Sequence, residues 1–192
     1  MRANKNDLKR FSKQIILKKI GVVGQKRIFS AKVLVVGVGG LGCPLILYLA
    51  NSGVGNIGII DNDKVEESNL NRQILFTQKD IGKFKVLQAK KVIKNINKNI
   101  KVSVYKSKID KNNITSIIKK FDIICDGTDN FKTRYLINDF CLRYKKKLIS
   151  HSPKPPDLTC PYSSPNQPAS PWTTFPLIVF KFLIVHQDRF KE

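Results

Sequence analysis

A glycine-rich turn follows the first strongly apolar segment of the chain. Residues 33–36 are all apolar, and the next six, Gly37-Val38-Gly39-Gly40-Leu41-Gly42, fit the G-x-G-x-x-G pattern of a strand-to-helix turn. Glycine has no β-carbon, so the backbone can approach a phosphate closely and the N–H groups of the following helix can bind it. Several classes of nucleotide-dependent enzyme carry this pattern. It therefore predicts a nucleotide site without identifying the nucleotide.

An acidic residue follows the second apolar segment. Asp61 comes directly after residues 57–60, where a carboxylate can accept hydrogen bonds from both ribose hydroxyls of a nucleotide. Taken with the glycine-rich turn alone, this residue fits an NAD(P)-dependent reductase as well as an ATP-dependent enzyme.

Polar residues further along the chain favour a polyphosphate ligand. They are Asn69, Arg72, Gln73, Lys85 and the run Asp126-Gly127-Thr128-Asp129-Asn130. Two fixed cations, Arg72 and Lys85, could clamp a triphosphate, and Asp129 could hold the Mg²⁺ that neutralises it. A hydride cofactor needs no such clamp, whereas cleavage of ATP between its α- and β-phosphates does. These residues therefore argue against the reductase alternative.

Hydrophobic periodicity predicts the elements that position these residues. The expected strands are 33–36, 57–60, 102–105, 121–125 and 148–149, and the expected helices are 7–18, 41–51, 83–97, 114–119 and 132–144. Right-handed crossovers would assemble them into an α/β fold with a doubly wound, Rossmann-like parallel sheet in the order 3-2-1-4-5 and helices on both faces. The ligand is then expected above the carboxyl ends of strands one, two and four.

The composition changes after Ser150. Eight of the nine prolines fall in residues 151–192, but only four of the 35 Lys and Arg residues do. Because proline fixes φ and removes a backbone donor, this tail is expected to be a linker, a disordered segment or sequence altered by a frame disruption. The chain is thus expected to comprise a nucleotide-binding domain over residues 1–150 and an atypical tail over 151–192.

The formal net charge of +21 favours acidic partners. The excess is mostly lysine and is spread along the chain, whereas nucleic-acid recognition relies heavily on arginine, so we expect no nucleic-acid partner. Neither a signal peptide nor an apolar run long enough for a bilayer is recognisable in the sequence. This favours the cytoplasm or an organelle stroma such as that of a plastid, without secretion or a membrane partner.

The four cysteines, Cys43, Cys125, Cys141 and Cys160, form no C-x-x-C pair. They are widely spaced and lie mostly in apolar runs, which indicates buried, reduced thiols. Cys160 has no partner at ligand spacing, so we expect no zinc site.

Five segments together resemble a known family: "RFSKQIILKKIGVVGQKRI", "VLVVGVGGLGCP", "IGIIDNDKVEESNLNRQ", "DIGKFKV" and "CDGTDNFKTRYLIND". In this order and spacing they resemble the ThiF/MoeB family of sulfur-carrier adenylyltransferases, relatives of the ubiquitin-activating enzymes. The resemblance covers about residues 7–150 and implies an ATP-binding adenylyltransferase domain. In that family, the C-terminal Gly-Gly carboxylate of a ubiquitin-like sulfur carrier, of the molybdopterin or thiamine type, attacks the α-phosphate of ATP. The products are an acyl-adenylate and pyrophosphate.

The resemblance also implies a role for each matched position. Gly39 and Gly40 would lie against the phosphates, and Asp61 would bind the ribose. The other implied phosphate contacts are Asn69, Arg72, Gln73 and Lys85. The catalytic set would be Arg72, Lys85, the Mg²⁺-binding Asp129, and Arg10, which would reach the ATP of the other subunit of a homodimer.

Each of these roles has a structural alternative. Residues 128–130 could only cap the following helix, and Lys83 could take the place of Lys85. Family members usually continue with strands that form a carrier groove and with two C-x-x-C pairs that bind zinc, and neither is recognisable after Ser150. We therefore expect impaired adenylation. A non-catalytic nucleotide-binding or regulatory paralogue is the main alternative, followed by an NAD(P)-dependent reductase.

Overall fold

A five-stranded parallel sheet lies at the centre of the structure, a computed structural model that describes residues 9–150. Its order is β3-β2-β1-β4-β5, and each neighbouring pair is parallel. The strands are β1 (Lys32–Val36), β2 (Asn56–Ile60), β3 (Lys101–Tyr105), β4 (Ile123–Asp126) and β5 (Lys147–Ser150). The predicted doubly wound topology is confirmed.

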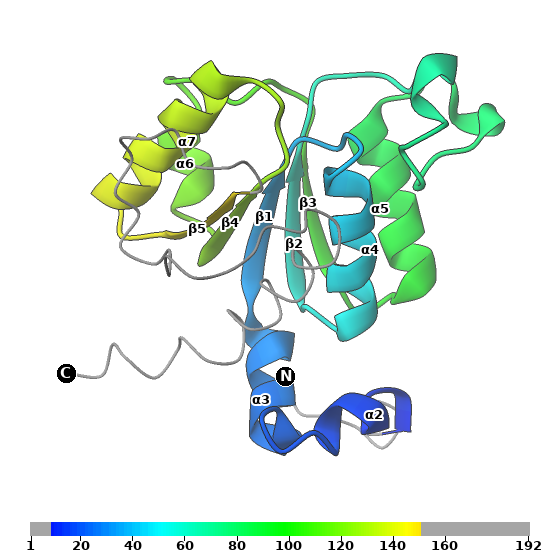
Figure 1. Ribbon diagram of the computed structural model, residues 1–192, viewed down its shortest axis with the longest axis vertical. Helices are drawn as coiled ribbons and strands as arrows, with labels where there is room; N and C mark the ends of the chain where they lie inside the picture. The colour runs from blue at the N-terminus through cyan, green and yellow to red at the C-terminus, as the bar shows by residue number, and fades with distance from the viewer. Residues whose placement is uncertain (1–8, 151–192) are drawn as a thin grey trace, which may run out of the picture.

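Helices cover both faces of this sheet (Figure 1). On one face lie α4 (Gly42–Ser52) and α5 (Lys85–Ile96), and on the other lie α6 (Ile114–Ile118) and α7 (Phe131–Arg143). Two 3-10 turns, η1 (Glu67–Asn69) and η2 (Gln78–Asp80), lie in the loop between β2 and α5. None of the described helices is long and apolar enough to cross a bilayer.

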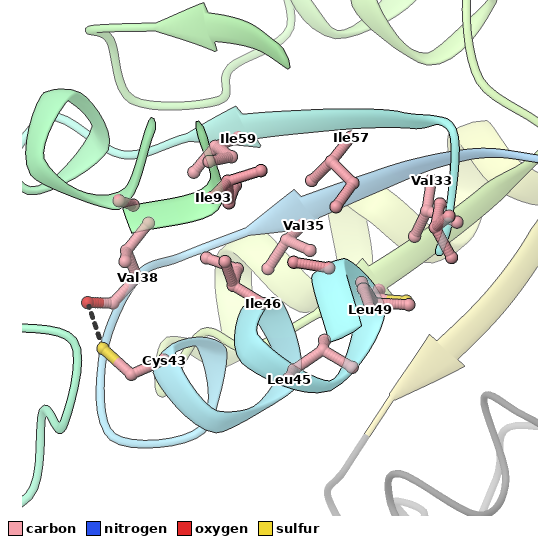
Figure 2. Close-up of a cluster of buried hydrophobic side chains, with 14 of the residues drawn as sticks. Val33, Val35, Val38, Cys43, Leu45, Ile46, Leu49, Ile57, Ile59 and Ile93 are labelled. Carbon is pink, nitrogen blue, oxygen red and sulfur yellow. Dashed lines mark hydrogen bonds between the residues drawn. The ribbon is translucent and has the colours of Figure 1, made fainter. Parts of the chain in front are cut away.

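The sheet has a hydrophobic cluster on each face, because successive strand residues point to opposite sides. Val33 and Val35 of β1 belong to the cluster on the side of α4, where Val35 lies beside Ile46 (Figure 2). Leu34 and Val36 belong to the cluster on the side of α6 and α7. Burial on both faces explains why the central strands read as continuous apolar runs.

The predicted N-terminal helix over residues 7–18 is wrong in extent. Within the described part, residues 9–10 and α2 (Ser12–Ile15) are helical with a turn at residue 11 between them, and turns lead from α2 into an unpredicted helix, α3 (Gly21–Ser30). Packing explains α3: Ile28 and Phe29 are buried, and the Phe29 ring meets that of Phe11 edge-on at 5.1 Å between centroids. Tertiary contacts therefore override the low helix propensity of the glycines in α3.

The fourth strand begins later than the predicted residue 121. Phe121 precedes β4 and is buried, with its ring packed against Gly58 of β2 where a β-carbon would overlap it. Phe121 is therefore apolar because it fills the space beside a strand glycine, not because it belongs to the strand.

Candidate nucleotide site

The glycine-rich turn connects β1 to α4 at the edge of the sheet where the strands end (Figure 1). Gly37 has a φ of +87°, and a β-carbon there would come within 3.1 Å of the Gly127 carbonyl oxygen. A β-carbon on Gly42 would overlap the Gly37 carbonyl oxygen. Gly39 instead faces open space, with no atom of the described residues within 4 Å of such a β-carbon. Gly37 and Gly42 thus shape the turn, while Gly39 leaves room for a ligand.

Arg72 reaches the turn from the loop between β2 and α5. A β-carbon on Gly40 would lie 3.5 Å from Cγ of Arg72, so the stem of this arginine occupies the space beside Gly40 that a side chain there would contact. Its Nη1 donates to the Ser68 carbonyl oxygen at 3.0 Å and to Oδ1 of Asn71 at 3.1 Å. Arg72 is exposed, so its guanidinium is available to an anion bound at the turn.

Asp61 follows β2 and anchors the turn through its side chain. Oδ2 accepts a hydrogen bond from the Val38 N–H at 2.6 Å, and Oδ1 accepts one from the Asp63 N–H at 2.8 Å. A carboxylate offers about four acceptor sites, so both oxygens can still accept from ribose hydroxyls. The predicted ribose residue therefore also fixes the turn that would approach the phosphates.

The polar loop after β2 is closed at its base by a short antiparallel pairing. Lys64 and Phe84 form an antiparallel bridge, and the Lys85 N–H donates to the Asp63 carbonyl oxygen at 3.0 Å. This pairing brings the first residue of α5 back beside the end of β2. The loop that carries Asn69, Arg72 and Gln73 is thereby held at both ends.

Lys85 is buried at the start of α5, with 6% of its surface exposed. Its Nζ lies 3.1 Å from Oδ2 of Asp63. The alternative cation, Lys83, has half of its side chain exposed and faces Asp80 at 3.9 Å. Lys85 therefore suits a phosphate site at this edge better than Lys83 does.

Asn69 and Gln73 are both buried, with 7% and 3% of their surfaces exposed. The Asn69 carbonyl oxygen accepts from the N–H groups of Arg72 and Gln73, which forms the turn that exposes Arg72 and buries Gln73. Oε1 of Gln73 has no hydrogen-bond partner among the described residues. An unsatisfied buried amide oxygen costs about 1–3 kcal/mol, so a ligand or water donor at this position would stabilise the loop.

The turn after β4 is held by a buried ion pair. Asp126 is 1% exposed, and its Oδ2 lies 3.0 Å from Nε of Arg134 in α7. Its Oδ1 accepts from the N–H of Thr128 at 3.0 Å and from the hydroxyl of Thr128 at 2.7 Å. Sequence reasoning gave Arg134 no role. The available signal was an arginine one helical turn inside α7, within reach of the acidic residue that ends β4.

Asp129 lies exposed in this turn, and its carboxylate has no hydrogen bond or ion pair with residues 9–150. The neighbouring Asn130 caps α7 by accepting from the Thr133 N–H at 3.3 Å. The capping alternative therefore holds for Asn130 and leaves Asp129 available. Among the described residues, no three His, Cys, Asp or Glu side chains group as a metal site. A single carboxylate still suits Mg²⁺, which commonly takes its other ligands from substrate phosphates and water.

Arg10 lies away from the site of its own chain. Its Nη2 donates to the Ile96 carbonyl oxygen at 2.7 Å, at the end of α5 opposite to Lys85. This geometry gives Arg10 a capping contact within the chain. Its reach into the site of a second subunit remains a prediction.

Three thiols, Cys43, Cys125 and Cys141, are buried and free, as predicted, and Cys160 lies outside the described residues. Cys43 at the start of α4 donates to the Val38 carbonyl oxygen at 3.6 Å (Figure 2). Burial raises the pKa of Cys43 to about 12, although the nearby charge of Lys85 is among the groups that oppose this shift. Cys43 is therefore a neutral packing residue beside the site.

Comparison with known proteins supports a nucleotide site. The model of the ThiF family matches residues 11–154. "Adenylyltransferase and sulfurtransferase MOCS3" of Culex quinquefasciatus is 49% identical over 149 residues, which is 78% of this chain and 34% of that protein. The sulfur carrier protein adenylyltransferase of Thermus thermophilus is 42% identical over 149 residues, which is 78% of this chain and 55% of that protein.

One solved structure with a similar fold has a nucleotide bound. The E. coli tRNA N6-threonylcarbamoyladenosine dehydratase in complex with ATP has a TM-score of 0.74 and 26% identity, over 78% of this chain and 61% of that one. Of the MOCS3 relative described above, this chain spans only about one third of the length.

Proposed function

This chain belongs to the ThiF family, and we propose that it is the nucleotide-binding part of an ATP-dependent adenylyltransferase. Its substrate would be the C-terminal Gly-Gly carboxylate of a ubiquitin-like sulfur carrier of the molybdopterin or thiamine type. The observation that carries the proposal is that the fold brings two cations, distant in sequence from the glycine-rich turn, to the same edge of the sheet. Arg72 lies beside the turn at Gly40. Lys85 is linked to the turn through Asp63 and Asp61, because Asp61 accepts from the Val38 N–H.

Each side chain of the site has a part in binding ATP. Asp61 would accept from the ribose hydroxyls, and the open space at Gly39 would admit the phosphates to the backbone N–H groups. Arg72 and Lys85 would donate to the phosphate oxygens. Asp129 would hold Mg²⁺, which, when bound, neutralises the developing charge on pyrophosphate.

The chemical step needs no general base, because the attacking carboxylate is already ionised. Its oxygen forms a bond to the α-phosphorus, the bond to the bridging oxygen breaks, and pyrophosphate leaves with the electron pair. Positioning and charge neutralisation by Arg72 and Lys85 would then supply most of the rate.

We also propose that the protein forms a homodimer in which Arg10 of each chain acts at the site of the other chain. The contact of Arg10 with Ile96 leaves it remote from its own Lys85, which agrees with action in trans. The compartment we propose is the cytoplasm or an organelle stroma.

Equilibrium titration with Mg·ATP and with NADH tests the nucleotide. We expect Mg·ATP to bind and NADH not to, because the site offers two cations for a triphosphate. Tighter binding of NADH would revive the reductase alternative and refute the proposal.

Carrier-dependent exchange of pyrophosphate into ATP tests the reaction, with a panel of Gly-Gly-ended carriers and a full-length family member as reference. The predicted impairment depends on residues 151–192, which lie outside the described residues. Slow exchange with intact ATP binding is expected. Exchange that stays absent with every carrier would favour the non-catalytic paralogue, whereas exchange as fast as the reference would overturn the impairment.

A further inference from the structure

Asp63 connects the expected ribose contact to the expected phosphate contact. Its N–H donates to Oδ1 of Asp61 at 2.8 Å. Its carbonyl oxygen accepts from the Lys85 N–H at 3.0 Å, and its Oδ2 accepts from Nζ of Lys85 at 3.1 Å. One residue thus contacts both Asp61 and Lys85 through three separate atoms.

Lys85 is placed where a cation needs a counter-ion. It is buried, and it occupies the first position of α5, where the positive end of the helix dipole disfavours an ammonium group. Within the described part of the chain, Asp63 supplies the ion pair recorded for Lys85.

We propose that Asp63 is a positioning residue that fixes the ammonium group of Lys85 relative to Asp61. This inference rests on the proposed ATP site. The side chain of Asp63 is 58% exposed, so it can hold Lys85 from the solvent side without filling the site. An ammonium group has three donors, and the bond to Asp63 leaves the others for phosphate oxygens. The ribose and the polyphosphate are then bound by groups at a set separation.

The test is a double-mutant cycle between Asp63→Ala and Lys85→Met, read as the dissociation constants of Mg·ATP and of adenosine. Asp63→Ala keeps both backbone contacts and removes only the carboxylate. We expect it to weaken Mg·ATP binding about five- to tenfold and to leave adenosine binding within about twofold. In the Lys85→Met background, the same substitution should change Mg·ATP binding less than about twofold. Asp63→Asn, which retains an acceptor oxygen, should recover part of the loss.

Three results would overturn the inference. Equal loss of Mg·ATP affinity in both backgrounds, or an equal loss for adenosine, would show that Asp63 acts only on the folding of the loop. Tighter Mg·ATP binding by Asp63→Ala would show that its carboxylate competes with the phosphates instead of positioning Lys85. If the unsubstituted protein failed to bind Mg·ATP, the proposed function itself would be refuted. This outcome differs from a failure of the Asp63 inference, which shows only in the substituted proteins.

Discussion

Substitution of Arg72 by Met gives a direct measure of the phosphate site. It removes the guanidinium but keeps an unbranched stem beside Gly40, where an added β-carbon would lie 3.5 Å from Cγ of Arg72. The guanidinium bonds that are lost, to Ser68 and Asn71, are local and exposed, so the fold should lose little stability. A charge-assisted contact to a phosphate is worth about 1.5–3 kcal/mol. Binding of Mg·ATP should therefore weaken by about 10- to 150-fold.

Isothermal titration with Mg·ATP, and with adenosine as the phosphate-free control, measures this effect. Lys101→Met is the matched control variant, because it removes one exposed positive charge at the start of β3, at the opposite edge of the sheet. Arg72→Met should lose affinity for Mg·ATP and keep its affinity for adenosine. If Arg72→Met and Lys101→Met weakened Mg·ATP binding equally, the contribution would be general electrostatic attraction, and Arg72 would not belong to the site.

Three further predictions concern the ion pair, the thiols and the dimer. Asp126→Ala should lower the free energy of unfolding in urea by about 3–5 kcal/mol, because it leaves Arg134 uncompensated with 14% of its side chain exposed; a loss below about 1 kcal/mol would contradict a buried pair. Burial raises the pKa of Cys43 from 9.0 to about 12, so the contribution of its neutral thiol to stability should be full at neutral pH and should decrease as the pH rises from about 9 toward 12. Its alkylation at pH 8, followed by mass spectrometry, should therefore be slow until urea is added, and rapid labelling of the native protein would refute its burial. Sedimentation at micromolar concentration should give about twice the monomer mass, and mixing Arg10→Ala with Arg72→Met should restore part of the exchange activity that each lacks alone. A strict monomer whose Mg·ATP affinity is unchanged by Arg10→Ala would refute action in trans.

The centre of the sheet was predictable because β1 and β2 are buried on both faces along most of their length. Such strands are apolar at nearly every position, so residues 33–36 of β1 are all aliphatic and β2 is broken only by Gly58 after its first residue. Helix α3 was not predictable on the same grounds. Gly21 and Gly24 lower its local propensity, and its stability comes from contacts such as that between Phe29 and Phe11, which only the folded chain brings together.

The candidate site divides in a similar way. Residues that follow strands, such as Asp61 and Asp129, could be assigned to one edge of the sheet from topology alone, since parallel strands all end at the same edge. Asp63 could not be given a role in that way. Its contacts depend on the antiparallel pairing at the base of the loop, which joins residues 22 positions apart through backbone hydrogen bonds that leave no pattern in the side-chain sequence.

Arg134 is a second residue whose role could not be predicted from the sequence. Its charge on α7 predicts an exposed surface residue, because isolated arginines on helices usually face solvent. It is instead drawn inward by Asp126, whose buried carboxylate requires a cation and several donors. The hydroxyl of Ser150 also donates to this carboxylate at 3.2 Å. The Asp126 carboxylate therefore links Ser150 at the end of β5 to Thr128 in the turn that carries Asp129, so a change in the chain where it leaves β5 has a direct physical route to the proposed Mg²⁺ ligand.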